Sequence, residues 1–560
     1  MYYIFKVEII YCYDPCIMRR IWPLLLLLVT ACKKKDFNAD ILIKNAVVYT
    51  ADSAFTVRDA FVISAGKIVA VGKAADLEEK YTAKEVIDAQ GKAIYPGFID
   101  AHTHFYEYGM GLQQVNLKGI TNWHTVTDSV QAFARSNPDG WVLGNGWDQN
   151  LWPGRKFPDK AVLDSLFPMR PVLLARIDGH AAIANRAALD IAGIKPDQKI
   201  AGGEIETING KLTGVLLDNA VGIVTRKIPA ADEQTIQKAL LAAQQNCLSV
   251  GLTTVDDAGL PYAMVNTINQ LQKKGDLKMR MYLMLADREE NYNYLLKNGI
   301  VKTPRLSVRA IKMYADGALG SRGACLLQPY SDQAGWSGFL LANQQHFKQV
   351  AERLATTNIQ LCTHAIGDSA NRVMLKIYAG VLKGKNDKRW RIEHAQIVAP
   401  EDLHYFGDNN IIPSVQPTHA TSDMYWAGKR LGEDRLKTAY AYKQLLKQNG
   451  WMPLGTDFPV ESINPMYTFY AAVVRKDLKG YPQKGFQPEN AITRTEALKG
   501  MTIWAAKANF EEKEKGSIEP GKYADFVILD ADIMRISASQ LPYTKVLKSY
   551  INGEKVYEKK

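Results

Sequence analysis

The chain has 560 residues, of which 47% are hydrophobic and 10% aromatic, as is typical of a globular protein with a large core. This length exceeds one ordinary domain, so we expect a large barrel plus a smaller domain, or several domains. The formal net charge is +11, but the basic residues are spread along the chain and form no long stripe. Nucleic acid is therefore not expected as a partner.

Residues 1–31 are predicted to be a secretory signal, with Met18 as an alternative start. Arg19 and Arg20 precede an apolar run at 24–28, which is too short to span a bilayer permanently. The ending Val29-Thr30-Ala31-Cys32 resembles the bacterial lipobox, which implies cleavage before Cys32 and lipidation of that thiol. An uncleaved anchor or a mistaken start codon is the alternative interpretation.

The predicted location follows from this signal. We expect an exported lipoprotein of the bacterial cell envelope, periplasmic or anchored in the outer membrane, with residues 32–39 as a tether. Three cysteines then remain, at positions 247, 325 and 362, and their scatter predicts no disulfide framework. The expected partners are the membrane, through the lipid, and a small-molecule substrate; a homodimer stays open.

Both ends of the remaining chain are rich in predicted strands. Strand patterns occur at 41–49, 60–64 and 67–71, and again at 524–529 and 545–556. We therefore predict one small β-sandwich domain built from residues 40–95 and 510–560.

The middle of the chain alternates short apolar strands with helical stretches, which is typical of a parallel α/β barrel. We predict an (β/α)₈ TIM-like barrel over residues 96–509. Its eight predicted strands are 98–104, 252–257, 279–284, 308–314, 359–364, 390–394, 411–416 and 451–457. The gap between the first two strands is too long for one crossover, so residues 110–230 are predicted to be an inserted subdomain that could cover the barrel mouth.

Two histidines end the first predicted barrel strand. His102 and His104 follow the apolar run 94–101, and alternate residues of a strand share one face. Two imidazoles placed in this way can bind one metal ion without backbone strain. The simpler interpretation is two unrelated histidines at the end of a strand.

Later strands also end in polar side chains. In a parallel barrel the carboxyl ends of the strands converge, and chemistry takes place there. A lone histidine or lysine at such a position is usually structural, but five strand ends carrying imidazole, amine or carboxylate indicate a shared site. Imidazoles and one carboxylate suit zinc or a similar divalent metal. The residues in question are His102, His104, Lys312, His364, His394 and Asp457.

These motifs together resemble the amidohydrolase superfamily, and within it an amidohydrolase-3 branch similar to the N-substituted formamide deformylases. The resemblance extends from about residue 41 to the C-terminus. It is carried by PGFIDAHTH at 96–104, GLTTV at 251–255, Lys312 with Asp316-Gly317, THAIGD at 363–368, RIEH at 391–394, GTDFPV at 455–460 and GSIEPGKYAD at 516–525.

The resemblance implies the ligand set. His102, His104 and Asp457 would hold the more buried metal, and His364 and His394 the second. Lys312 would be carbamylated by CO₂, because a bare ammonium among apolar neighbours and two dications is disfavoured. The alternative is a mononuclear site in which Lys312 pairs with Asp316 or Glu393.

The resemblance also implies substrate contacts. His180 and His419 match positions that line the substrate pocket, although a structural role is an equal alternative for each. Arg322, on a long loop after the fourth strand, could contact substrate as well, or it could pack only within its own loop.

The function that the resemblance implies is hydrolysis of a non-peptide C–N bond, in an amide, N-formyl or cyclic amide. One or two divalent ions, of which zinc is expected, would activate a hydroxide, with Asp457 as the general base. Two alternatives stay open. One is a mononuclear, deaminase-like hydrolase, and the other is a surface lipoprotein that binds a ligand without turnover.

Overall fold

The structure is a computed structural model and describes residues 38–560. The predicted signal, Cys32 and most of the tether lie outside the described residues. Within the described part of the chain, none of the helices has both the length and the apolar character needed to cross a membrane.

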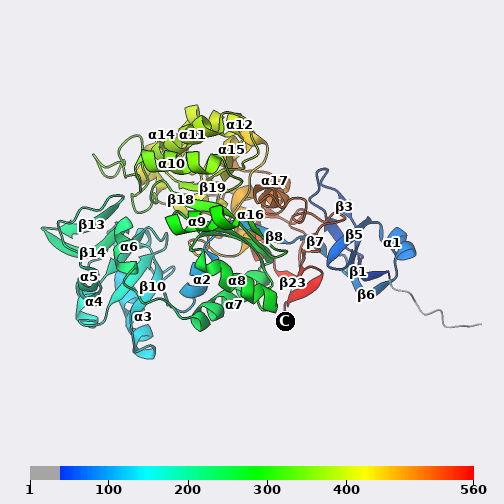
Figure 1. The fold of residues 1–560 in the computed structure, drawn as a ribbon, viewed down its shortest axis with the longest axis horizontal. Coiled ribbons are helices and arrows are strands. Elements are labelled where there is room, and N and C mark those ends of the chain that lie inside the picture. Colours follow the sequence, from blue (N-terminus) through cyan, green and yellow to red (C-terminus); the bar gives the residue numbers. More distant parts are fainter. Residues whose placement is uncertain (1–37) are drawn as a thin grey trace, which may run out of the picture.

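A nearly closed barrel of parallel strands forms the centre of the molecule, so the predicted fold class is confirmed (Figure 1). Six strand pairs, all parallel, run in the order β21-β20-β19-β18-β16-β15-β8. The short β17 (Val301–Lys302) adds to β18. The barrel strands are β8 (Phe98–Thr103), β15 (Leu252–Leu260), β16 (Arg280–Ala286), β18 (Leu306–Tyr314), β19 (Gln360–Ala365), β20 (Arg391–His394) and β21 (Ile412–Ser414).

The eighth predicted strand, 451–457, is not a regular strand in the structure. Only an isolated parallel bridge between Val415 and Leu454 occurs there. Pro453 has no N–H to donate, which limits a regular ladder. The segment still closes the barrel, because Ala101 N donates to Leu454 O and Asp457 N donates to His102 O at 2.8 Å. Asp457 is thereby placed next to the end of β8.

Helices cover the outside of the barrel. In α10 (Gln344–Ala355) the Asn343 side chain caps the first turn, and the buried residues recur at helical spacing, facing β19. The others are α2 (Phe105–Gly111), α7 (Glu233–Ser249), α8 (Ala263–Lys274), α9 (Glu289–Asn298), α11 (Asp368–Leu382), α12 (His404–Asn409), α13 (Pro417–Asp423), α14 (Ala427–Leu436), α15 (Tyr442–Asn449), α16 (Pro465–Val474), α17 (Arg494–Gly500) and α18 (Ile503–Ala508).

Two further sheets come from the ends of the chain and share one core, in which Phe61 and Phe526 meet edge to face at 5.1 Å. The first contains β1 (Ala39–Lys44), β4 (Ala60–Ser64), β5 (Lys67–Gly72) and β6 (Ala83–Asp88), with α1 (Ala74–Lys80) beside it. The second joins β2 (Val47–Tyr49), β3 (Val57–Arg58) and β7 (Ala93–Pro96) to β22 (Phe526–Leu529), β23 (Val546–Ile551) and β24 (Glu554–Glu558). The exact domain boundaries stay a prediction.

Between β8 and β15 the chain forms another sheet with its own core, coloured cyan in Figure 1. Trp147 is fully buried in this core. The strands are β9 (Val115–Asn116), β10 (Val142–Trp147), β11 (Val172–Arg176), β12 (Ala181–Ala184), β13 (Gly203–Ile208) and β14 (Lys211–Asp218). The accompanying helices are α3 (Trp123–Ser136), α4 (Ala161–Leu166), α5 (Arg186–Ala192) and α6 (Asn219–Thr225).

A buried ion pair connects the barrel to the terminal sheets. Arg280 on β16 donates from Nε and Nη2 to both oxygens of Asp525, at 2.5 and 2.9 Å. Burial raises the pKa of Asp525, but Arg280 outweighs this and holds it below its ordinary value. The pair therefore stabilises the fold above the pKa that Asp525 has in the unfolded chain, near 4, and this contribution is lost as the pH falls through the lower folded pKa.

We expect Asp525→Asn to lower the free energy of unfolding by about 3–5 kcal/mol, because it leaves a buried arginine without its counter-charge. The measurement is the thermal midpoint of unfolding at neutral and acid pH, where the difference from wild type should shrink. As a control, Glu401→Gln removes an exposed partner of Arg372 and should cost at most about 1 kcal/mol. Equal effects of the two changes would contradict the expected role of the buried pair.

Candidate metal centre

The structure brings six of the predicted residues together at the carboxyl ends of the barrel strands. His102 lies on β8, Lys312 on β18 and His364 on β19. His104 follows β8, His394 ends β20, and Asp457 follows the closing segment. Adjacent parallel strands place these side chains at one end of the barrel, as the sequence predicted.

His102 and His104 both present an Nε2 lone pair to Asp457. His102 Nδ1 donates to Glu393 Oε2 at 2.6 Å, and His104 Nδ1 donates to the carbonyl of Ala258 at 3.1 Å. Because both partners are acceptors, each Nδ1 carries the hydrogen, and in the neutral rings each Nε2 is left with a lone pair. The two Nε2 atoms lie 3.5 and 3.3 Å from Asp457 Oδ1.

Three groups that lack hydrogens thus converge on one point. Asp457 Oδ1 is buried and makes no hydrogen bond within residues 38–560. Buried polar atoms are rarely left unpaired. A cation at this point would satisfy all three atoms, so this donor set fits a divalent metal ion such as zinc.

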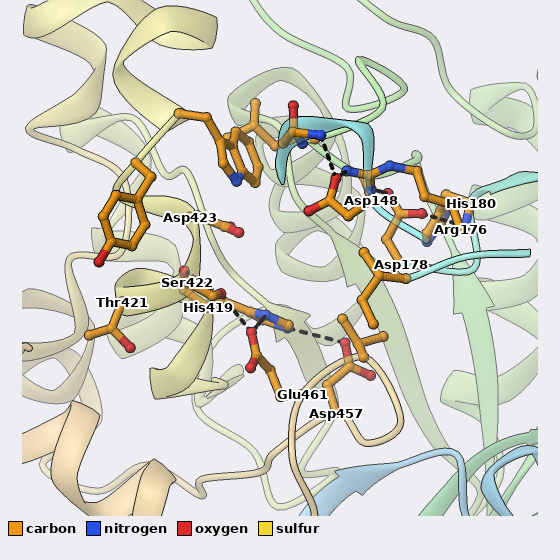
Figure 2. A pocket seen from close by; sticks show the side chains of 18 of the residues that line it. Asp148, Arg176, Asp178, His180, His419, Thr421, Ser422, Asp423, Asp457 and Glu461 are labelled. Carbon is orange, nitrogen blue, oxygen red and sulfur yellow. Dashed lines mark hydrogen bonds and ion pairs between the residues drawn. The ribbon is translucent and has the colours of Figure 1, made fainter. Parts of the chain in front are cut away.

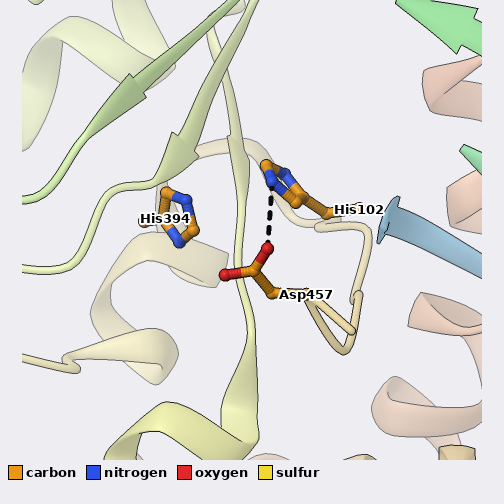
Figure 3. A group of neighbouring side chains, drawn as sticks. All are labelled: His102, His394 and Asp457. Atoms are coloured by element: carbon orange, nitrogen blue, oxygen red, sulfur yellow. Dashed lines mark ion pairs between the residues drawn. The ribbon is translucent and has the colours of Figure 1, made fainter. Parts of the chain in front are cut away.

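A second pair of imidazoles lies beside the first. The rings of His364 and His394 are 4.5 Å apart between centroids, and His394 is 4.9 Å from His102. His364 Nε2 and His394 Nδ1 are buried and unpaired among the described residues. In Figure 3 the carboxylate of Asp457 lies between the rings of His102 and His394, whose ligand atoms are all within 4.8 Å of one another. The donor set therefore offers ligands for more than one ion.

The amine of Lys312 lies inside this group. Its Nζ is fully buried and 3.0 Å from His102 Nε2. Within residues 38–560, no carboxylate forms a salt bridge to it, so it pairs with neither Asp316 nor Glu393 there. Burial lowers the pKa of Lys312. An amine in this position is closer to its neutral form than a surface lysine is.

Burial also sets the charge of the surrounding groups. It lowers the pKa of His364 and of His394 well below the ordinary value, and neighbouring cationic groups lower both further. For Asp457, burial raises the pKa, but the neighbouring imidazoles of His104 and His419 outweigh it and hold the pKa well below the usual range. Neutral imidazoles and an ionised carboxylate are the protonation states that bind metal.

His419 connects Asp457 to a second carboxylate (Figure 2). His419 Nε2 donates to Asp457 Oδ2 at 3.1 Å, and its Nδ1 lies 3.5 Å from Glu461 Oε1. Burial lowers the pKa of His419, but both carboxylates outweigh this and raise it to about 10. The sequence predicted His419 near the site but missed Glu461, whose only signal was its position four residues after Asp457.

A cavity of about 740 Å³ opens onto the group. It is lined by residues from the barrel and from the inserted sheet, among them His104, His180, His364, His394, His419 and Asp457. His180 lies on the wall that the inserted sheet provides (Figure 2). Arg322 is not among the lining residues; it forms an ion pair with Asp332 at 3.0 Å, within its own loop. The structure therefore does not bring Arg322 to the other predicted residues.

Comparison with known proteins agrees with this arrangement. Residues 85–557 match a family described as "Amidohydrolase family". The chain is 32% identical over 540 residues to Protein LONG AFTER FAR-RED 3 of Arabidopsis thaliana, covering 93% of this chain and 92% of that protein. It is 27% identical to the N-substituted formamide deformylase of Arthrobacter pascens, covering 93% of this chain and 98% of that enzyme.

A solved structure supports the same assignment. An uncharacterized metal-dependent hydrolase from Pyrococcus horikoshii is similar with a TM-score of 0.73 and 26% identity, covering 89% of this chain and 99% of that one. The family match spans most of the chain, including every candidate ligand. This chain therefore belongs to the amidohydrolase family.

Proposed function

We propose that this protein is a metal-dependent hydrolase of a non-peptide C–N bond, in an amide, N-formyl or cyclic amide. The observation that carries the proposal is the convergence of ligand atoms from His102, His104 and Asp457 beside the cavity, which His104 and Asp457 line. A site that only bound a ligand would not need a buried, ionised carboxylate beside an open cavity.

His102, His104 and Asp457 would hold one ion, and His364 with His394 a second; we expect zinc, which suits nitrogen and oxygen ligands. When bound, such an ion lowers the pKa of a water molecule and polarises the substrate carbonyl. The cavity beside these residues holds the substrate, and its walls limit access of bulk water.

Asp457 is placed to move the proton. Its low pKa keeps it ionised, which a base must be before it takes the proton of the attacking water. His419, whose other ring nitrogen lies beside Glu461, donates to the second carboxylate oxygen, so the first stays directed at the reacting group. The proton then passes to the leaving nitrogen, which departs as an amine.

Lys312 is proposed to be carbamylated. Its nitrogen lone pair would attack the carbon of CO₂, so that one N–C bond would form, one C=O π bond would open to give C–O⁻, and one N–H proton would pass to water. The product is a carbamate anion, which turns an amine into a carboxylate-type ligand. The amine is buried, lacks a carboxylate partner among residues 38–560 and has a lowered pKa, and this supports the proposal because only the neutral amine reacts.

A panel of N-formyl, N-acyl and cyclic amides, assayed with zinc-reconstituted protein, tests the proposed function. At least one class should be hydrolysed, with amine and carboxylate groups formed in equal amounts, as two products from an open-chain amide or in one product from a cyclic amide. Aminopurines and aminopyrimidines serve as the comparison. Release of ammonia from these rings alone, with one bound ion, would favour the deaminase-like alternative, and no turnover by metal-replete protein would favour a binder.

We also propose that the protein is an exported lipoprotein anchored through Cys32. Cys32→Ala should move it from the membrane fraction to the soluble fraction, because acyl chains provide the anchor without a spanning helix. A chain that begins at Lys33 should be soluble and active. Retention of the Cys32→Ala protein in the membrane fraction would count against the lipid anchor.

A further inference from the structure

A histidine–carboxylate pair from the inserted sheet lies beside the metal centre. Ala181 on β12 is opposite Leu217 on β14 in an antiparallel pair. His180, one residue before Ala181, and Asp218, one residue after Leu217, therefore also face each other. Asp218 N donates to His180 O at 2.7 Å, and His180 Nδ1 lies 2.6 Å from Asp218 Oδ1. The Asp218 side chain is completely buried, whereas His180 is 15% exposed and lines the cavity.

The position of Asp218 is tightly constrained. Its backbone has φ 49° and ψ −120°, which is a strained conformation for a residue other than glycine. A Cβ atom at Gly317 would lie 2.6 Å from its carboxylate oxygens, and one at Gly323 would lie 2.5 Å from Oδ2. Glycine at these two positions of the loop after β18 therefore leaves the space that the Asp218 carboxylate occupies. Asp218 Oδ2 has no hydrogen bond within residues 38–560. Among these residues, the Asp218 carboxylate therefore hydrogen-bonds to His180 alone.

Asp218 fixes which nitrogen of His180 is available. A carboxylate can only accept, so Nδ1 carries the hydrogen and Nε2 presents a lone pair. Nε2 makes no hydrogen bond to the described residues, and the ring centroid lies 5.0 Å from that of His364. In the neutral ring, Nε2 is therefore an unused acceptor on the wall of the cavity.

We propose that Asp218 is a positioning residue that holds His180 so that Nε2 accepts a hydrogen bond from the N–H of the scissile amide. This inference rests on the proposed amide hydrolysis and narrows its substrate class. Amides that keep one N–H should be preferred over N,N-disubstituted amides, which leave the acceptor unpaired. One such hydrogen bond is worth about ten- to hundred-fold in discrimination.

The test compares kcat/KM for an N-alkylformamide and for the same compound carrying an added N-methyl group. Wild type should prefer the first by about ten-fold or more. His180→Phe keeps the bulk of the ring but removes the acceptor, so the preference should fall close to one while bound metal is unchanged. Asp218→Asn and Gly323→Ala should each reduce the preference, because both disturb the carboxylate that orients His180.

Gly380→Ala is the matched glycine control, since Gly380 lies in α11 with no atom within 4 Å of the added Cβ. It should keep the wild-type preference. Three results for His180→Phe would overturn this inference but not the proposed function. They are an unchanged preference, an equal loss of kcat/KM on both substrates, and loss of bound metal. Failure of metal-replete wild type to hydrolyse any amide would overturn it together with the proposed function.

Discussion

Replacing Asp457 with asparagine is expected to lower turnover of an amide substrate by about 10²–10⁴, the usual cost of losing a general base. The carboxylate faces the histidine ligands with one oxygen and accepts from His419 with the other. Asparagine keeps the shape and one oxygen ligand, but it cannot take the proton of the attacking water. The effect should therefore be on kcat far more than on the fold.

The backbone favours this substitution as a clean test. Asp457 has φ 64°, and asparagine tolerates the left-handed region better than most residues. Asp477→Asn is the matched control, because Asp477 lines the same cavity but accepts hydrogen bonds from the exposed Tyr425 and from the backbone N–H groups of Lys479 and Tyr481, away from the histidine ligands. Metal content and melting temperature should be measured in the same samples. Near-wild-type turnover in metal-replete Asp457→Asn would place the proton shuttle elsewhere.

Lys312→Ala is expected to remove about one equivalent of metal and most of the activity. Without the amine no carbamate can form, so the site loses an anionic ligand amid neutral imidazoles. The measurement is metal content alongside turnover. An unmodified Lys312 in a metal-replete, high-resolution crystal structure would refute carbamylation and leave a mononuclear hydrolase.

Chemical rescue tests the Lys312 prediction further. Alanine leaves a cavity in a fully buried position, and a short carboxylic acid can enter it and supply the missing anion. Formate, acetate or high bicarbonate should therefore restore part of the activity of Lys312→Ala. The same additives should not restore Asp457→Asn, because asparagine leaves no such space. Equal stimulation of both variants would show that the effect is unspecific.

The ligand positions were predictable because they depend on local rules. Alternation along β8 predicts that His102 and His104 lie on one side of the strand. The convergence of parallel strands predicts that His364 and His394 lie at the same end of the barrel. The eighth strand was harder to predict, because Pro453 alone does not exclude a strand, and the lack of a regular ladder becomes apparent only from the neighbours of the segment. Its residue Asp457 nevertheless lies where a strand end would have put it.

The residues that orient the ligands could not be predicted, since they depend on contacts between distant parts of the chain. Glu393 hydrogen-bonds His102 across 291 positions, and nothing near either residue indicates the pairing. Asp218 meets His180 only because β12 pairs with β14 in one register, and it fits only because Gly317 and Gly323 lack side chains. Arg322 was predicted to contact substrate, but it forms an ion pair with Asp332 within its own loop, and this contact could not be predicted from the sequence either.

Titration of metal-free protein with zinc, followed by hydrolysis of an amide identified in the panel, tests the metal-dependent mechanism most directly. We predict no detectable hydrolysis after exhaustive chelation, because Asp457 with its low pKa is a weak base, and a bound ion is needed to lower the pKa of the attacking water. The rate should then rise with bound zinc and saturate at one or two equivalents. Full activity in the metal-free protein would contradict a metal-dependent hydrolase.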